Sequence, residues 1–289
     1  MTRFHLILLA VTPVGFTGCG GSASSWRFDN PAIRKIQNEE TARHVTDGAS
    51  KAAIKSNLGE RVRIVFSEDI QNPSQDFPAA GRAAALTQDG YFITAYHVVE
   101  DGPFYIQETK RIRRPPAGGF KTSETSKYFS KRRYAGRLVW SNPAADVAIL
   151  KFPVKGQPCF KDFEVAPAPG SIVYSADDEG YWALAADERG EFRLENRVGN
   201  GDFFAAGRIS GKVEEDAESN TLTLTTTLVA RGGMSGSALV TTRLGLCGVL
   251  SRVEGFVPFQ KPKTLAVMIE PGFISELIKA DREKKKAPK

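Results

Sequence analysis

Short extended segments dominate the sequence from Glu60 onward and constrain its fold more than any other feature. Each is a run of β-branched, aromatic and other apolar residues, and turn residues such as QDG, EDG, SNP and GNG separate one run from the next. About thirteen runs can be counted: 61–67, 82–87, 91–95, 103–108, 134–140, 146–152, 171–175, 181–185, 203–210, 221–229, 237–242, 246–253 and 263–269. So many short strands indicate an antiparallel all-β architecture, built as two barrels or two sandwiches.

Helical patterns are confined to the two ends of this β region. Residues 31–58 contain helix formers at rough helical spacing, and they predict a partly helical extension within a tether and extension over 20–59. Pro271 opens the run PGFISELIKADREKKK, which predicts one closing helix over 271–285. A basic tail at 286–289 follows this helix.

The β region divides at a proline-rich stretch, PCFKDFEVAPAPG, close to residue 160. We therefore expect one folded domain over 60–280, with a first barrel over 60–157 and a second over 158–270. The basic stretch 110–133 is interpreted as an exposed loop between strands, although a partner site there is an open alternative.

The first nineteen residues have the layout of an export signal. An apolar stretch over 4–16 follows a basic residue, and small residues lead to Cys19. Pro13 breaks a stretch that is already too short to form a stable transmembrane helix. The ending FTGC also resembles a bacterial lipobox, in which Cys19 would carry lipid, and the flexible GGSASS after it suits a tether. A plain secretory signal is the alternative.

Export implies an oxidising compartment and a location in the bacterial cell envelope, as a periplasm-facing lipoprotein, or outside the cell. With Cys19 lipidated, Cys159 and Cys247 form an even pair. A disulfide between them and two buried free thiols are both open. Membrane attachment would come through the lipid anchor at Cys19.

Charge and motif content exclude several classes of function. The chain of 289 residues has a net charge of +6, much of it in the C-terminal run, which favours a solvated tail over a nucleic-acid contact. No Walker loop, EF-hand or helical zinc motif is present, so the sequence calls for no metal and no organic cofactor.

Three residues of the β region combine into a chemical pattern. His97 is the only histidine there, and it follows the strand-like YFITA. Asp146 opens the apolar run DVAILKF, where a carboxylate needs a partner. Ser235 lies in RGGMSGS, whose glycines indicate a specially shaped turn. Acyl transfer by serine needs this set: a nucleophile, an imidazole base and a carboxylate that orients the imidazole.

The strings TAYHV, DVAIL and GGMSGS, in that order along an all-β chain, resemble the signatures of trypsin-like (chymotrypsin-fold) serine peptidases, most closely the bacterial HtrA-like type without a PDZ domain. The resemblance implies two antiparallel six-stranded β-barrels with a C-terminal helix. It assigns Ser235 as nucleophile, His97 as general base and Asp146 as orienting carboxylate. It also assigns the N–H groups of Gly233 and Ser235 to the oxyanion hole.

The resemblance fails at one position and extends to two others. Where activated digestive enzymes carry an Asp that pairs with a newly cut N-terminus, this chain has Met234. We therefore expect no activation of that kind, and some other contact must hold the turn 231–234. Val229 matches the base of the specificity pocket, and Ser251 matches the strand that pairs with the substrate backbone.

The function expected from the sequence is an exported serine endopeptidase that acts on a protein or peptide substrate. An apolar pocket base at Val229 favours a small or medium apolar residue at the cleaved position, because a buried cation there would be unpaired. The alternative is a catalytically silent scaffold of the same fold that acts as a binding lipoprotein.

Overall fold

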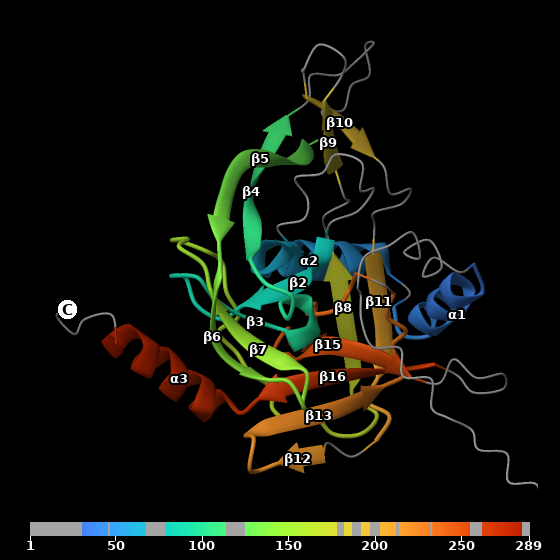
Figure 1. Ribbon diagram of the computed structural model, residues 1–289. Coiled ribbons are helices and arrows are strands. Elements are labelled where there is room, and N and C mark those ends of the chain that lie inside the picture. The colour runs from blue at the N-terminus through green and yellow to red at the C-terminus, as the bar shows by residue number, and fades with distance from the viewer. Residues whose placement is uncertain are drawn as a thin grey trace, which may run out of the picture.

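The computed structural model describes residues 31–45, 47–67, 79–113, 125–177, 182–186, 192–196, 203–211, 214–231, 233–254 and 262–284. Cys19, the predicted signal segment and the basic tail lie outside these ranges. The described residues form two curled antiparallel sheets and a separate two-stranded sheet, with two helices before them and one after (Figure 1). The all-β fold with a closing helix and a helical N-terminal extension is thus confirmed.

The first sheet has the strand order β5-β4-β1-β2-β3-β7-β6. Its strands are β1 (Val62–Ser67), β2 (Ala79–Ala85), β3 (Tyr91–Thr94), β4 (Phe104–Arg113), β5 (Thr125–Ala135), β6 (Arg137–Asn142) and β7 (Val147–Lys151). β5 and β6 are separated only by Gly136, whose N–H donates to the Phe104 carbonyl at 2.9 Å. A Cβ at Gly136 would overlap the rings of Phe104 and Phe152, so this corner of barrel 1 needs glycine.

The second sheet has the order β11-β8-β14-β15-β16-β13-β12. Its strands are β8 (Ile172–Asp177), β11 (Phe203–Arg208), β12 (Glu214–Asp216), β13 (Thr221–Thr226), β14 (Ala238–Thr241), β15 (Leu246–Glu254) and β16 (Lys263–Ile269). An antiparallel bridge between Ile209 and Thr226 joins the end of β11 to the end of β13. This bridge closes barrel 2, and β12 extends the sheet beyond it.

Successive residues of a buried strand face different apolar clusters, because side chains alternate along it: Phe92 belongs to one cluster, and Tyr91 and Ile93 belong to another. Within barrel 1, Phe92 and Phe104 meet Phe152 edge to face, with ring centroids 5.4 and 5.8 Å apart. A second and larger apolar cluster contains residues of both barrels, together with Leu58 of α2 (Gly48–Arg61) and Ile274 of α3 (Pro271–Lys284). The two barrels therefore share buried apolar contacts, and these fix the segments that carry the functional residues.

The N-terminal helices pack on barrel 2. Helix α1 (Pro31–Ala42) contacts it through Glu40, which accepts a hydrogen bond from the Thr227 hydroxyl at 2.7 Å. In α2, Lys51 lies over the ring of Phe204 at 5.5 Å from its centroid. None of the helices in the described ranges has both the length and the apolar character needed to cross a membrane.

One expectation from the sequence was wrong. The basic stretch 110–133 is not simply a loop, because β4 runs to Arg113 and β5 starts at Thr125, and the two strands pair from Tyr105↔Ala135 to Arg113↔Thr125. Residues 114–124 between them lie outside the described ranges. The runs of Lys and Arg concealed the strands, since polar residues weaken the apolar signal on which strand prediction depends. The hairpin β9 (Trp182–Ala186) and β10 (Phe192–Asn196) was foreseen only in its first strand.

Candidate active site

The histidine is held by the end of a buried strand. All four residues of β3 are buried, and the chain then turns through a 3-10 helix, Tyr96–Val98, in which Val98 is buried against barrel 1. The Val98 N–H donates to the Ala95 carbonyl at 3.2 Å. His97 therefore leaves the barrel on a short rigid turn, and 22% of its side chain is exposed.

The aspartate leads into β7 in a strained conformation. Its N–H donates to the Pro143 carbonyl at 3.2 Å, and the Asn142 side chain accepts a hydrogen bond from Ala145 N–H, so the segment before β7 is a tight turn. Asp146 has φ +55°, in the left-handed region that Asp tolerates better than most residues. Backbone strain of this kind concentrates at functional sites.

His97 and Asp146 contact each other directly. His97 Nδ1 lies 2.9 Å from Asp146 Oδ2 and 3.0 Å from Oδ1, and the His97 backbone N–H donates to Oδ1 at 3.0 Å. Because the ionised carboxylate can only accept, Nδ1 carries the proton and Nε2 is the basic atom of the ring. This is the tautomer that a general base requires.

A second donor completes the surroundings of the carboxylate. The Ser251 hydroxyl, from β15, donates to Asp146 Oδ2. Burial by itself would raise the pKa of the Asp146 carboxyl, but the hydrogen bonds from His97 and Ser251 outweigh it and hold the pKa below its ordinary value. The carboxylate is therefore ionised at neutral pH although only 15% of its side chain is exposed.

The serine lies in a turn that glycine makes possible. Gly233 has φ +80° and Gly236 has φ +79°, and a Cβ at Gly236 would overlap the Arg82 carbonyl oxygen. The Gly236 N–H donates to the Leu250 carbonyl at 2.7 Å, and the Leu250 N–H donates to the Ser237 backbone carbonyl at 2.9 Å. The turn is thus fastened to β15 immediately before the residue whose hydroxyl reaches Asp146.

Barrel 1 contacts this turn from the other side. The Arg82 N–H donates to the Ser235 carbonyl at 2.8 Å. A Cβ at Gly81 would lie 2.6 Å from the Val98 side chain and 2.7 Å from the same Ser235 oxygen. Ser235 therefore lies beside the 3-10 turn of His97. The hydrogen bonds of the His97 ring run to Asp146, and its contact with the Ser235 hydroxyl stays a prediction.

The remaining predicted residues can be located. Val229 is buried, between β13 and the turn that carries Ser235, which we call the nucleophile turn. The Ala230 N–H donates to the buried Thr264 hydroxyl at 3.0 Å. Ser251 lies in β15, but its hydroxyl contact with Asp146 was not foreseen from the sequence. Cys159 and Cys247, for which a disulfide was left open, are both free thiols. Burial raises the pKa of the Cys247 thiol. No cluster suited to a metal ion occurs among the described residues.

Sequence reasoning also missed Arg82. It is 3% exposed, and its guanidinium donates to the Gly233 carbonyl. The available signal was a lone arginine in AAGRAAA, since a charged residue within a strand of small apolar residues requires a buried partner.

Comparison with known proteins supports this reading of the fold. No curated protein sequence matches the chain. Among solved structures, an HtrA-type protease, AlgW, determined with a decapeptide, matches with 16% identity and a TM-score of 0.50 over 80% of this chain and 67% of that chain. The apo protease domain of MamO from Magnetospirillum magneticum matches with 17% identity and a TM-score of 0.47 over 76% and 97%. The trypsin-like peptidase domain matches residues 81–249, which span the histidine, the aspartate and the serine, and the chain therefore belongs to the trypsin-like peptidase domain family.

Proposed function

We propose that this protein is an exported serine endopeptidase that cleaves peptide bonds through Ser235, His97 and Asp146. The observation that carries the proposal is the pair of hydrogen bonds from His97 Nδ1 to the Asp146 carboxylate, beside the turn that holds Ser235. The decapeptide bound to the similarly folded AlgW supports a peptide as the ligand.

The proposed reaction is acyl transfer in two steps. Ser235 Oγ attacks the carbonyl carbon of the scissile bond while His97 Nε2 takes the hydroxyl proton. The imidazolium is stabilised by Asp146, and it then donates that proton to the leaving amine. Water, deprotonated by the same imidazole, attacks the acyl carbon. The bond from this carbon to Ser235 Oγ breaks, the imidazolium returns the proton to Oγ, and the second product leaves.

The oxyanion would be bound by the N–H groups of Gly233 and Ser235. Gly233 has the positive φ that lets a backbone donor face such a site without a clashing Cβ. Loss of one such donor costs roughly a hundred to a thousandfold in kcat.

For specificity, we propose a pocket base at Val229 and a preference for small or medium apolar residues. Val229 is 2% exposed, so a Lys or Arg side chain bound against it would lose water without gaining a countercharge. Sequencing the products of a peptide library by mass spectrometry tests this point, and a majority of cleavages after Lys or Arg contradicts it.

Export and lipidation at Cys19 complete the proposal and rest on the sequence of residues 1–19. Expression of the full chain in a bacterium with labelled palmitate tests both. We expect label in the envelope fraction, and its loss in Cys19→Ala. A processed chain that takes up no label leaves the plain secretory signal as the explanation.

A fluorophosphonate probe tests the chemistry, because it phosphonylates an activated serine, with fluoride as the leaving group. We expect covalent labelling that disappears in Ser235→Ala and falls sharply in His97→Ala. Ser237→Ala is the matched control, since this hydroxyl lies two residues away and is fully buried. Absence of labelling in a folded wild-type protein contradicts the peptidase and favours the catalytically silent binding protein.

A further inference from the structure

Arg82 connects the two barrels at the nucleophile turn. It lies in the middle of β2, flanked by Gly81 and alanines, and is almost completely removed from solvent. Its N–H donates to the Ser235 carbonyl, and its own carbonyl accepts a hydrogen bond from the Thr94 hydroxyl. Its guanidinium donates to the Gly233 carbonyl. One residue of barrel 1 thus contacts both residues whose N–H groups form the proposed oxyanion hole.

The guanidinium contact holds one particular peptide group. The peptide between Gly233 and Met234 has its carbonyl bound by Arg82, and its N–H donates to the Arg231 carbonyl at 3.1 Å. With this plane held from both sides, the backbone torsions of Gly233, whose φ is +80°, relate it to the direction of the Gly233 N–H. Hydrogen bonds from an ionised donor are the stronger class, and burial strengthens them further.

The turn needs such a contact because neither Gly233 nor Met234 carries a charge that could orient it. Gly233 has access to both signs of φ, so its neighbouring peptide groups can rotate easily. Met234, the residue before the serine, is 2% exposed in the apolar core, and its sulfur accepts a hydrogen bond from Arg231 N–H at 3.3 Å. An apolar side chain fills this space but does not orient the Gly233 peptide.

We infer that Arg82 is a positioning residue, which holds the nucleophile turn so that the Gly233 N–H points toward the proposed oxyanion hole. It takes the place of an ion pair made by the residue before the nucleophile. This inference rests on the proposed function. Arg82 acts through the Gly233 carbonyl and does not touch the reacting atoms. Its removal should lower transition-state stabilisation and leave substrate binding almost unchanged.

The kinetic test compares Arg82→Met, which keeps an apolar stem without donors, with Arg82→Lys, which restores one charged donor. We expect Arg82→Met to lower kcat by about ten- to a hundredfold, less than the loss of a whole oxyanion donor, with KM little changed. Arg82→Lys should recover part of kcat. Arg63→Met is the matched control: Arg63 lies on the neighbouring strand β1 and bonds the Gln157 side chain, and its loss should leave kcat unchanged.

A second measurement stands apart from catalysis. In the Ser235→Ala background, hydrogen exchange of peptides covering 231–237 should be faster in Arg82→Met than in Arg63→Met, at equal global stability. If wild type labels with the probe yet Arg82→Met keeps its kcat and its exchange rates, the inference fails and the proposed function survives. If wild type neither labels nor cleaves, the proposed function fails, and the exchange comparison still decides whether Arg82 holds the turn.

Discussion

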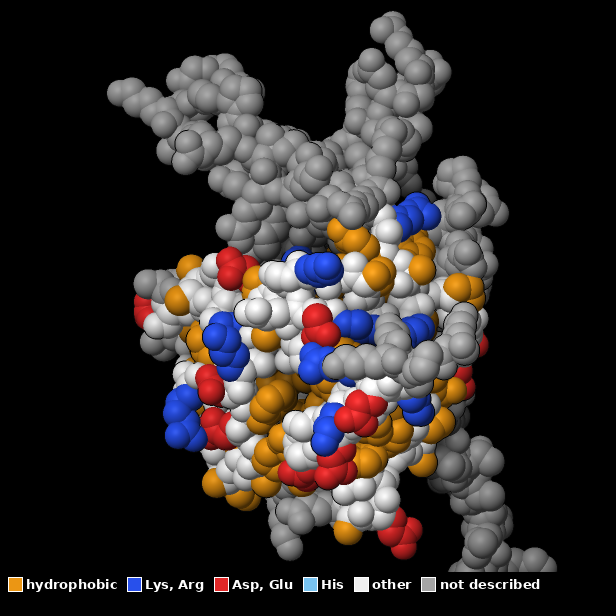
Figure 2. Space-filling view, turned by 90° about the vertical axis from the view of Figure 1, so that its left-hand side faces the viewer, with side chains coloured by type: hydrophobic (Ala, Val, Ile, Leu, Met, Phe, Trp, Pro, Cys, Tyr) orange, Lys and Arg blue, Asp and Glu red, His pale blue; other side chains and the backbone are white. Residues whose placement is uncertain are grey.

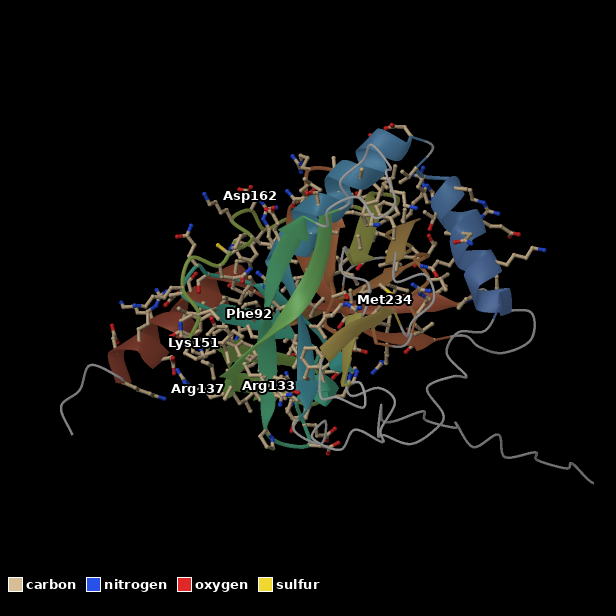
Figure 3. The ribbon with its side chains drawn as sticks, turned by 90° about the horizontal axis from the view of Figure 1, so that it is seen from above. Phe92, Arg133, Arg137, Lys151, Asp162 and Met234 are labelled. Carbon is tan, nitrogen blue, oxygen red and sulfur yellow. The ribbon has the colours of Figure 1, made fainter. Side chains whose placement is uncertain are left out.

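Two polar networks lie at the two ends of strand β3. Both contain carboxylates with several donors, but one belongs to the candidate active site and the other joins the closing helix to barrel 1. At its C-terminal end, His97 and Ser251 surround the Asp146 carboxylate. At its N-terminal end lies a group that we call the α3 clasp, which joins the closing helix to barrel 1. Figure 3 shows Arg137 and Lys151 on the side of α3, well separated from Met234 of the nucleophile turn.

The α3 clasp consists of ion pairs and ring contacts. Tyr91 OH donates to Asp281 at 2.7 Å, and Arg137 pairs with the same carboxylate. Arg282 donates to Asp89 at 2.8 Å, and the Lys151 ammonium lies 4.2 Å from the centroid of the Tyr91 ring. The face of the molecule on this side carries charges of both signs interspersed with apolar side chains (Figure 2).

Carboxylate acidity does not distinguish the two networks. Burial raises the pKa of Asp89, but hydrogen bonds from Thr87, Arg282 and Lys151 lower it to about 2, just as donors lower that of Asp146. The difference lies in the partners. The clasp cations are Lys and Arg, residue types whose ordinary pKa lies far above neutrality, whereas the partner of Asp146 is an imidazole, the side-chain type whose ordinary pKa lies closest to neutrality. A shifted pKa therefore marks a site only when its partner can do chemistry.

The largest effect should come from Asp146→Asn. The amide would favour the wrong imidazole tautomer, so we expect kcat to fall by about ten-thousandfold with the fold retained. Steady-state kinetics on a cleaved peptide, with circular dichroism as the check on folding, measures this. A kcat within tenfold of wild type would show that the two networks are both merely structural.

Ser251→Ala should have a smaller effect on the same carboxylate. It removes one hydrogen bond to an ionised acceptor, a contribution of about 1.5–3 kcal/mol, so kcat should fall by roughly ten- to a hundredfold. KM should change little, because alanine keeps the backbone of β15. Ser219→Ala, on an exposed turn, is the control that should retain full activity. A higher KM with unchanged kcat would instead show that Ser251 only contacts the substrate.

Asp89→Asn, in the clasp, should affect stability and leave kcat unchanged. The folded-state pKa of about 2 lies below the unfolded value of about 3.9, so the ionised carboxylate stabilises the fold above that value and this contribution is lost as pH falls toward 2. Because the Asp89 side chain is 46% exposed, we expect less than about 1 kcal/mol near neutrality. Urea unfolding of both proteins between pH 7 and about 2 measures the difference, which should vanish at the acid end. A difference that is constant with pH would contradict this origin.

The sequence predicted the all-β fold, the closing helix, and the placement of His97 after one strand and Asp146 before another. These features are local, because apolar periodicity and turn residues report them directly. The contacts of Ser251 and Arg82 could not be predicted from the sequence, because each joins segments more than a hundred residues apart through side-chain geometry. The basic outer parts of β4 and β5, next to residues 114–124, were missed for another reason. Their Lys and Arg residues mask the strand pattern that predicted the start of β4 within 103–108. Pattern reasoning thus locates the reacting groups before it can identify the residues that hold them.

Ser237→Ala should produce the smallest change in stability and labelling. This residue lies in the nucleophile turn but belongs to neither polar network. Its hydroxyl is buried without a hydrogen-bond partner in the described part of the chain, whereas the hydroxyls and carboxylates of both networks are satisfied. Burying an unpaired hydroxyl is unfavourable, so its removal should leave the free energy of unfolding unchanged or raise it by up to about 1 kcal/mol. Probe labelling at Ser235 should persist, because the backbone bond between Ser237 and Leu250 is kept. Thermal unfolding followed alongside labelling tests both statements, and a clear loss of stability would mean that this hydroxyl has a structural partner of its own.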